Sequence, residues 1–381
     1  MPGRLMRARL SLPSPPPPRI LTSVSRVPLY GHDELRQHLE QAVARGALPA
    51  SLLLHGPRGV GKQRLALWLA EVLLCTGGPP RPCGACVHCR FTRALTHPDL
   101  HWYFPRPRLK DADPSFDEVR EDYAEAIAER VVQHGLYGPS SGSDGIYVAT
   151  VRTIVRSAAL SPAMASRKVF VIGDAERMVP QEGADAAANA FLKLLEEPPA
   201  DTTLILTSSE PGALLPTIRS RVVAIRAGGL PEEALRAFTR DPLVADRLRD
   251  DGVSATLEEL IPSLDGAPGR LLERDSWAEA TAQARRILDV AISPDRASRY
   301  RLAFAQGSSR ARGSFSDTLD ALEVLLHDRV RRAAGAGDDL AAVGAARSLG
   351  LVERAKEQAT GNVNPQLLTA ALLRDLSALL R

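Results

Sequence analysis

The sequence has no apolar run long enough to span a membrane, and its net charge is small. Residues 1–27 are basic and rich in proline, but they lack the apolar stretch of a secretory signal peptide. We therefore expect a cytoplasmic protein without membrane association. Residues 1–27 are expected to form a disordered arm, or in part to precede the true start codon. The formal net charge of +3, from 48 basic and 45 acidic residues, gives no argument for nucleic-acid binding by itself.

Cysteine is also scarce, and the four cysteines of the chain all lie within residues 75–89. Cys83, Cys86 and Cys89 are too close in sequence to form unstrained disulfides with one another. Together with Cys75 they are typical of a structural Zn²⁺ site, in which four thiolates hold the ion and leave no open position for catalysis. An iron–sulfur cluster uses similar spacings and remains an alternative. A redox thiol pair is disfavoured because it would leave two cysteines without a role.

One loop resembles a phosphate-binding P-loop but lacks its hydroxyl. In GxxxxGK(S/T) loops, backbone N–H groups and the lysine hold the phosphates, and the Ser or Thr hydroxyl coordinates Mg²⁺. Here Gly56, Gly59, Gly61 and Lys62 are present, and Gln63 stands at the hydroxyl position. A Gly-rich turn that merely opens a helix is the alternative. The pattern predicts a nucleotide site that keeps the groups for binding phosphates but lacks the hydroxyl that hydrolysis requires.

The segments around this loop alternate between strands and helices, which predicts a parallel sheet covered on both faces. The expected elements are strands over Ser51–His55, Lys168–Asp174 and Thr203–Leu206, and helices over Asp33–Arg45, Gln63–Leu74 and Ala188–Glu197. In P-loop folds an acidic residue at the end of the neighbouring strand faces Mg²⁺, and Asp174 has that place. We add Ser208, which follows the last of these strands, to the candidate nucleotide-binding residues.

Two other regions depart from this alternation. Residues 105–145 read as an insertion, with an acidic amphipathic helix over Ser115–Gly135 and a flexible loop over Gly138–Gly145. We expect the insertion to elaborate the surface rather than to form a site. From Pro231 onward helices replace strands, including a long helix over Asp317–Ala334 with a regular apolar face.

Several motifs together resemble those of bacterial clamp-loader subunits of DNA polymerase III. They follow the order of that family: the cysteine stretch, Thr96–Asp99, Asn189–Pro199 and Leu215–Arg221. Gly266–Gly269 and Asn362–Leu367 resemble the delta-prime subunits of this family more than its tau/gamma subunits. The resemblance covers about residues 28–381, without the inserted region.

This resemblance implies an α/β P-loop AAA+ domain with a zinc knuckle, followed by a small helical lid and an all-α C-terminal collar domain. The expected domains are an arm at 1–27, the AAA+ domain at 28–228 with the knuckle at 75–89 and the insertion at about 105–145, a lid at 229–275 and a collar at 276–381. It also implies a hetero-pentamer with delta and tau/gamma-type subunits, which loads the sliding clamp onto primer–template DNA.

Three positions depart from the pattern of an active AAA+ ATPase. Gln63 replaces the hydroxyl residue, Ala175 stands where a water-orienting Glu is expected, and Gly269 stands where the lid of an active subunit supplies an Arg. Arg270 is displaced by one residue. We therefore expect ATP and Mg²⁺ binding to be weak or absent, no independent ATPase activity, and a stator role in the polymerase holoenzyme.

The resemblance further implies that Arg221 is an arginine finger, which reaches the ATP held by the neighbouring subunit. The alternative is that Arg219, Arg221 and Arg226 form a solvated basic strip beside an edge strand. Two other functions stay open. An active tau/gamma-type ATPase is favoured by the intact glycines and Lys62, and a zinc-dependent DNA-binding module ranks last because the knuckle lacks an interleaved basic and aromatic surface.

Overall fold

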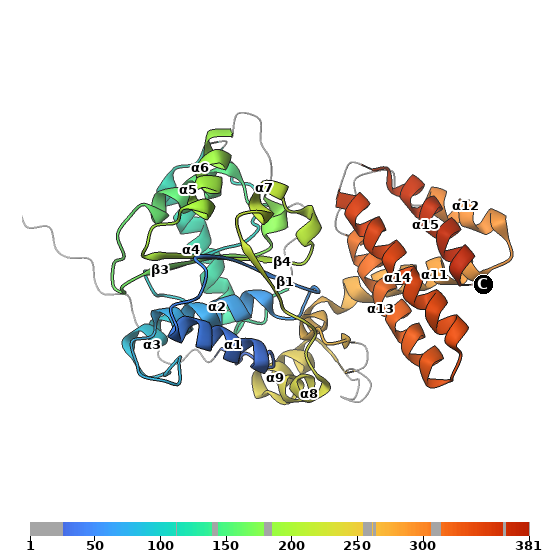
Figure 1. The fold of residues 1–381 in the computed structure, drawn as a ribbon, viewed down its shortest axis with the longest axis horizontal. Coiled ribbons are helices and arrows are strands. Elements are labelled where there is room, and N and C mark those ends of the chain that lie inside the picture. Colours follow the sequence, from blue (N-terminus) through green and yellow to red (C-terminus); the bar gives the residue numbers. More distant parts are fainter. Residues whose placement is uncertain are drawn as a thin grey trace, which may run out of the picture.

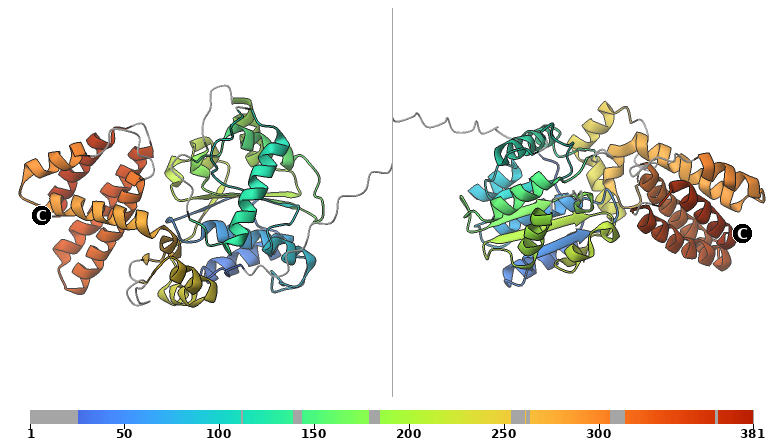
Figure 2. Two further views of the ribbon diagram at one scale, coloured as in Figure 1. Left: turned by 180° about the vertical axis from the view of Figure 1, so that it is seen from behind. Right: turned by 90° about the horizontal axis from the view of Figure 1, so that it is seen from above.

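The computed structural model describes residues 26–111, 113–138, 144–178, 185–253, 261, 264–305, 314–360 and 363–380. An α/β domain and a C-terminal helical domain lie side by side, and a small helical region lies beneath the junction between them in the view of Figure 1. Figure 2 shows the same two bodies from behind and from above. Within the described residues, no helix combines the length and the apolar character needed to cross a bilayer.

Five parallel strands form the sheet of the α/β domain in the order β2-β3-β4-β1-β5. Their bounds are β1 Ser51–His55, β2 Leu100–Tyr103, β3 Lys168–Ile172, β4 Thr202–Ser208 and β5 Val223–Arg226. The three interior strands are almost wholly buried, as near-continuous apolar runs in a parallel sheet should be. The expected strands are thus confirmed. The edge strand β2 was not anticipated, because its four residues carry only a short apolar signal.

Helices cover both faces of this sheet (Figure 1). One face carries α1 Asp33–Ala44, α2 Lys62–Leu74 and α3 Val87–Arg93, and the other carries α5 Val148–Ala158, α6 Asp185–Glu196 and the single turn α7 Pro216–Arg219. Helix α2 contacts β1, β3 and β4, so its buried side chains fill the centre of that layer. The helices expected on either side of the loop and before Pro198 are confirmed to within a few residues.

The inserted region belongs to the core of the domain, which differs from the surface role expected for it. Helix α4, Phe116–Val132, buries Val119, Tyr123 and Ala126, and the Tyr123 hydroxyl donates to Phe104 O at 2.7 Å. Its acidic composition reflects only the outward face, because the apolar positions face the end of β2. Most of the expected loop over Gly138–Gly145 lies outside the described residues.

The helices that follow the sheet divide between two hydrophobic cores. The first group shares the core of the α/β domain and comprises α8 Glu232–Arg240, α9 Pro242–Asp250 and the 3₁₀ helix η3 Pro268–Glu273. The second group has its own core and comprises α11 Arg274–Ile292, α12 Arg296–Ala305, α13 Ser314–Gly335, α14 Asp339–Thr360 and α15 Pro365–Leu379. Leu319 and Leu322, on the expected apolar face, are buried within it. The expected lid boundary at 275 falls in the first turn of α11.

Candidate functional site

The P-loop connects β1 to α2 in a backbone path that requires glycine. Gly56 has φ 150°, and a Cβ there would lie 2.0 Å from the carbonyl oxygen of Ala227. Gly59 and Gly61 have φ 80° and 93°, in the left-handed region that other residues rarely adopt. Gly61 is the N-cap of α2. The glycines read from the sequence therefore form the turn expected of a phosphate-binding loop.

Lys62 is buried and its ammonium group is bonded to its own loop. Its Nζ donates to Gly56 O at 3.0 Å, to Pro57 O at 2.8 Å and to Ser209 Oγ at 2.9 Å. These three bonds use all the donors of an ammonium group, and burial lowers the pKa of Lys62. The sequence interpretation chose Ser208, whose Oγ instead accepts from Glu210 N at 3.1 Å. The neighbouring serine is the one that the fold brings to the lysine.

Gln63 fills the position where a metal-binding hydroxyl would stand. Its Oε1 accepts from Trp102 Nε1 at 3.2 Å, and its Nε2 donates to Asp174 Oδ2 at 3.1 Å. A Cβ on Gly173, directly after β3, would lie 2.5 Å from the Gln63 amide, so the absence of a side chain there leaves room for the amide in this position. The Gln63 amide thus donates to Asp174, the carboxylate expected to face Mg²⁺. This donor is uncharged, so it does not replace the charge of the metal ion.

Two residues after Asp174, a second carboxylate faces the same cleft. Glu176 Oε1 accepts from Ser209 N at 2.9 Å, and its Oε2 is buried with no hydrogen-bond partner among the described residues. Burial, and then the negative charge of Asp174, raises the pKa of Glu176 to about 7. Ala175 between them is buried and offers no polar group. The pair therefore carries less negative charge near neutral pH than two ordinary carboxylates would.

The lid packs directly against the P-loop through glycine. Gly269 N donates to Gly59 O at 2.9 Å, and a Cβ on Gly269 would lie 2.8 Å from Gly59 Cα. No side chain fits at this position while the contact exists. The following Arg270 donates to Leu264 O at 2.5 Å and lies over the Trp277 ring at 4.5 Å. Its guanidinium is thus bonded within the lid and the start of α11.

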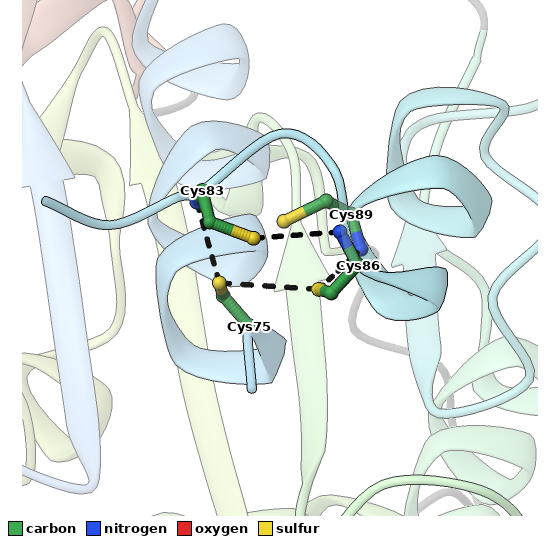
Figure 3. Close-up of side chains that lie close together, drawn as sticks. All are labelled: Cys75, Cys83, Cys86 and Cys89. Atoms are coloured by element: carbon green, nitrogen blue, oxygen red, sulfur yellow. Dashed lines mark hydrogen bonds between the residues drawn. The ribbon is translucent and has the colours of Figure 1, made fainter. Parts of the chain in front are cut away.

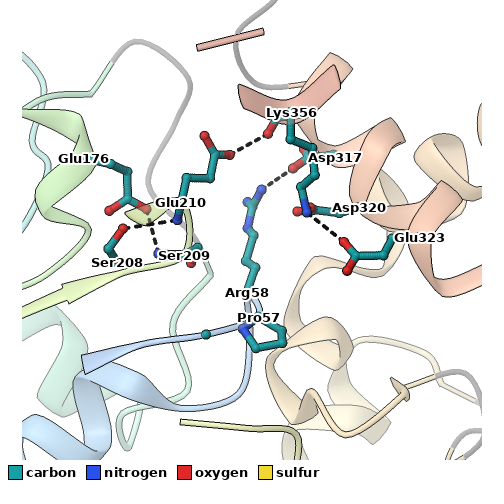
Figure 4. A network of polar contacts seen from close by, with 12 residues as sticks. Pro57, Arg58, Glu176, Ser208, Ser209, Glu210, Asp317, Asp320, Glu323 and Lys356 are labelled. Carbon is teal, nitrogen blue, oxygen red and sulfur yellow. Dashed lines mark hydrogen bonds and ion pairs between the residues drawn. The ribbon is translucent and has the colours of Figure 1, made fainter. Parts of the chain in front are cut away.

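Polar contacts also join the P-loop domain to the C-terminal helices, and nothing in the sequence pattern had indicated them (Figure 4). Arg58, in the middle of the P-loop, forms ion pairs with Asp317 of α13 and, at 3.2 Å, with Glu273. Ser316 Oγ donates to Glu210 Oε1 at 2.6 Å. The P-loop, the lid and α13 together line one cleft of about 2240 Å³. The position of the C-terminal domain is therefore tied to the loop itself.

The four cysteines come together at the end of α2 and the start of α3 (Figure 3). Their Sγ atoms all lie within 4.8 Å of one another, and those of Cys75 and Cys86 are 4.0 Å apart. A tetrahedral Zn–S₄ centre places its sulfurs roughly 3.8 Å apart, so this arrangement fits such an ion. Backbone N–H groups of Gly77 and Cys83 donate to Cys75 Sγ at 3.3 Å, as they do to metal-bound thiolates. The group can hold a metal ion.

Arg221 lies outside the chain's own cleft, just after α7. Its Nε donates to Glu196 Oε2 at 3.0 Å and its Nη1 donates to Thr217 O at 3.0 Å, while 30% of its side chain remains exposed. Arg219 is exposed on the same turn, whereas Arg226 lines the cleft. The three arginines of the expected strip therefore have different surroundings. The guanidinium group of Arg221 is bonded through Nε to the Glu196 carboxylate.

Comparisons with known proteins relate this chain to subunits of DNA polymerase III. A family model described as "DNA polymerase III, delta subunit" matches residues 31–229. Proteins named DNA polymerase III subunit delta' from Pseudomonas aeruginosa and Escherichia coli are each 30% identical, over 61% and 68% of this chain and 64% of each relative. A DNA polymerase III subunit gamma/tau from Mycobacterium tuberculosis is 30% identical over 55% of this chain and 30% of its own length. The chain thus matches just under two thirds of the length of the delta' relatives.

Proposed function

Because the chain belongs to the DNA polymerase III delta subunit family, we propose that it is a delta-prime-like subunit of a clamp loader. In this role it is a stator, a subunit that holds its position while neighbouring subunits bind and hydrolyse ATP, and it donates an arginine finger to one of them. It has no ATPase activity of its own. The observation that carries the proposal is the state of its P-loop.

The side chains at the positions that bind nucleotide in an ATPase form hydrogen bonds within this chain instead. Gln63 is bonded to Asp174, where a hydroxyl and Mg²⁺ would meet, and Lys62 is bonded to loop carbonyls. The Gly269 contact with Gly59 leaves no room for a lid arginine. Loss of such charge-stabilising groups costs orders of magnitude in rate. Nucleotide binding without turnover, or no binding at all, is what these contacts favour.

The proposed partners are delta and tau/gamma-type subunits in a hetero-pentamer, with the sliding clamp and primer–template DNA reached through that complex. Helices α11–α15 form the collar contact. In support, α12 exposes Tyr300 and Phe304, and α15 exposes Leu367, each more than 60% accessible. Large apolar side chains gathered on one domain are typical of protein interfaces.

We assign the cysteine group to structural Zn²⁺, because thiolate-rich tetrahedral sites select zinc or iron–sulfur clusters. Zinc would connect the end of α2 to α3 and supply folding energy to this corner of the domain. The site has no catalytic function in this proposal.

Clamp loading with a reconstituted complex tests the trans role of Arg221. Arg221→Ala should leave folding and pentamer assembly unchanged, because the side chain is partly exposed and its ion pair with Glu196 is worth at most about 1 kcal/mol. It should nevertheless lower ATP hydrolysis by the neighbouring subunit by roughly 10³-fold or more if it is the finger.

Arg219→Ala is the matched control, because it removes the same charge from the same turn. Equal losses for Arg219→Ala and Arg221→Ala that shrink as the salt concentration rises would show a general electrostatic contact and refute the finger. A different outcome would refute the stator role: robust turnover by this chain alone, abolished by Lys62→Ala, would identify an active gamma/tau-type ATPase.

A further inference from the structure

Three partly buried arginines meet at a short segment that follows α4. A Cβ on Gly135 would lie 2.5 Å from Arg64 Nη1 and 3.2 Å from Arg26 Cγ, so both arginines contact this glycine. The Arg130 guanidinium carbon lies 3.9 Å from the centre of the Tyr137 ring. We call Arg26, Arg64 and Arg130 the arginine cluster. Three like charges therefore surround one short stretch of chain.

The carboxylates nearest to the cluster act on it without direct contact. Within the described ranges none of the three arginines forms an ion pair. Three carboxylates act on the cluster through their charge without forming an ion pair with it, and each is also hydrogen-bonded to another side chain. These pairs are Glu71 with Arg93 at 2.9 Å, Asp241 with Tyr30 at 2.8 Å and Asp174 with Gln63 at 3.1 Å.

Two guanidinium groups of the cluster also have nitrogen atoms without an acceptor. Arg26 Nη1 and Arg130 Nη1 are buried and find no hydrogen-bond partner among the described residues. Burial lowers the pKa of both groups, and it lowers the pKa of Arg64 to about 10. Arg64 Nη1 donates to Gly135 O at 3.3 Å, and the Arg130 guanidinium lies over the rings of Trp102, Phe104 and Tyr137. The two Nη1 atoms of Arg26 and Arg130 still lack an acceptor, and a buried donor without an acceptor is costly, so an added acceptor would be favourable.

A ligand can reach this cluster from the cleft. Arg64, Arg130 and Tyr137 line the cleft, as do Lys62 and Gln63 of the P-loop. Arg64 lies in the first turn of α2 and Arg130 in the last turn of α4, so these two members of the cluster face the same cavity as the loop. Planar guanidinium groups present paired N–H donors that match the oxygens of phosphate.

We propose that the arginine cluster binds a phosphate-class anion without a metal ion. The anion is either inorganic phosphate or a phosphoryl group of a nucleotide. The arginines provide the positive charge that Mg²⁺ provides in a metal-dependent site, while Gln63 occupies the metal position beside Asp174. This proposal does not depend on the chain's role in a clamp loader.

Calorimetric titration and thermal unfolding of the full chain test it in phosphate-free buffer. The probes are inorganic phosphate, ADP with EDTA and ADP with Mg²⁺, with chloride added to equal ionic strength as the reference. We expect phosphate or ADP to raise the melting temperature more than chloride does, and EDTA to leave the effect intact. Equal effects of phosphate and ADP identify the free anion, and an effect of ADP alone identifies the nucleotide. An effect no larger than that of chloride, or one that requires Mg²⁺, overturns the proposal.

Arg64→Met and Arg130→Met remove charge but keep most of the aliphatic volume. Each should weaken phosphate or ADP binding about tenfold or more, a loss that is measured separately from any change in the melting temperature of the phosphate-free protein. Arg36→Met is the control: Arg36 also lies over an aromatic ring, Trp68, at 5.0 Å, but is not part of the cleft lining. Unchanged phosphate and ADP binding in both cluster variants would show a purely structural cluster.

Discussion

The amide of Gln63 should stabilise the α/β domain, and its removal should be measurable. Gln63→Ala deletes the acceptor of Trp102 Nε1 and the donor to Asp174. Trp102 is only 3% exposed, so its N–H would be left without water or protein acceptor, at a cost of about 1–3 kcal/mol. Loss of the bond to the carboxylate adds about 1 kcal/mol. The expected destabilisation is therefore about 2–4 kcal/mol.

Scanning calorimetry and urea unfolding of the full chain measure this change. For a domain of this size, 1 kcal/mol corresponds to roughly 2–4 °C in melting temperature, so Gln63→Ala should lower it by roughly 4–16 °C. Trp102→Phe and the double variant complete a cycle, in which the coupling energy should be about 1 kcal/mol. A Gln63→Ala protein within about 0.5 kcal/mol of the wild type would refute the reasoning.

Gln63→Thr separates the contribution of this amide to stability from its effect on Mg²⁺-dependent ATP binding. It should lose similar stability, because threonine cannot bridge Trp102 and Asp174. It should gain Mg²⁺-dependent ATP binding, since the hydroxyl can ligate the ion beside Asp174. Turnover should remain absent, because Ala175 cannot orient water. Mg²⁺-dependent ATP binding by the wild type would contradict this account.

Two further predictions concern the metal and the buried acid. Cys86→Ser should abolish the binding of about one zinc per chain and lower thermal stability, whereas a metal-free preparation of full stability would rule out the site. Burial raises the pKa of Glu176 from 4.5 to about 7, so its contribution to stability is full below pH 4.5 and is lost as the pH rises through 7. The melting temperature of Glu176→Gln relative to that of the wild type should therefore be higher at pH 8 than at pH 5. An equal difference at both pH values would contradict the raised pKa.

Much of the α/β domain could be predicted because its signals are local. The strand at Ser51–His55 and the helix after Lys62 follow from apolar runs and from glycines at positions of positive φ. The four cysteines could be grouped because they are close in sequence. Helix α4 was assigned to the surface because its composition is acidic, although three of its side chains are buried. Composition reports the outward face of a helix and does not reveal what covers the other.

Sequence by itself determined which residues form the loop, the cysteine group and the interior strands, since each depends on neighbours a few positions away. Tertiary structure alone decided their partners. Lys62 meets Ser209 rather than Ser208, Arg58 reaches Asp317 across 259 positions of chain, and Gly269 lies on Gly59. These contacts depend on how β4, the lid and α13 are placed around the P-loop. No periodicity encodes that placement, because it results from tertiary packing within the first core and, for Arg58 and Asp317, from the packing of the two cores against each other.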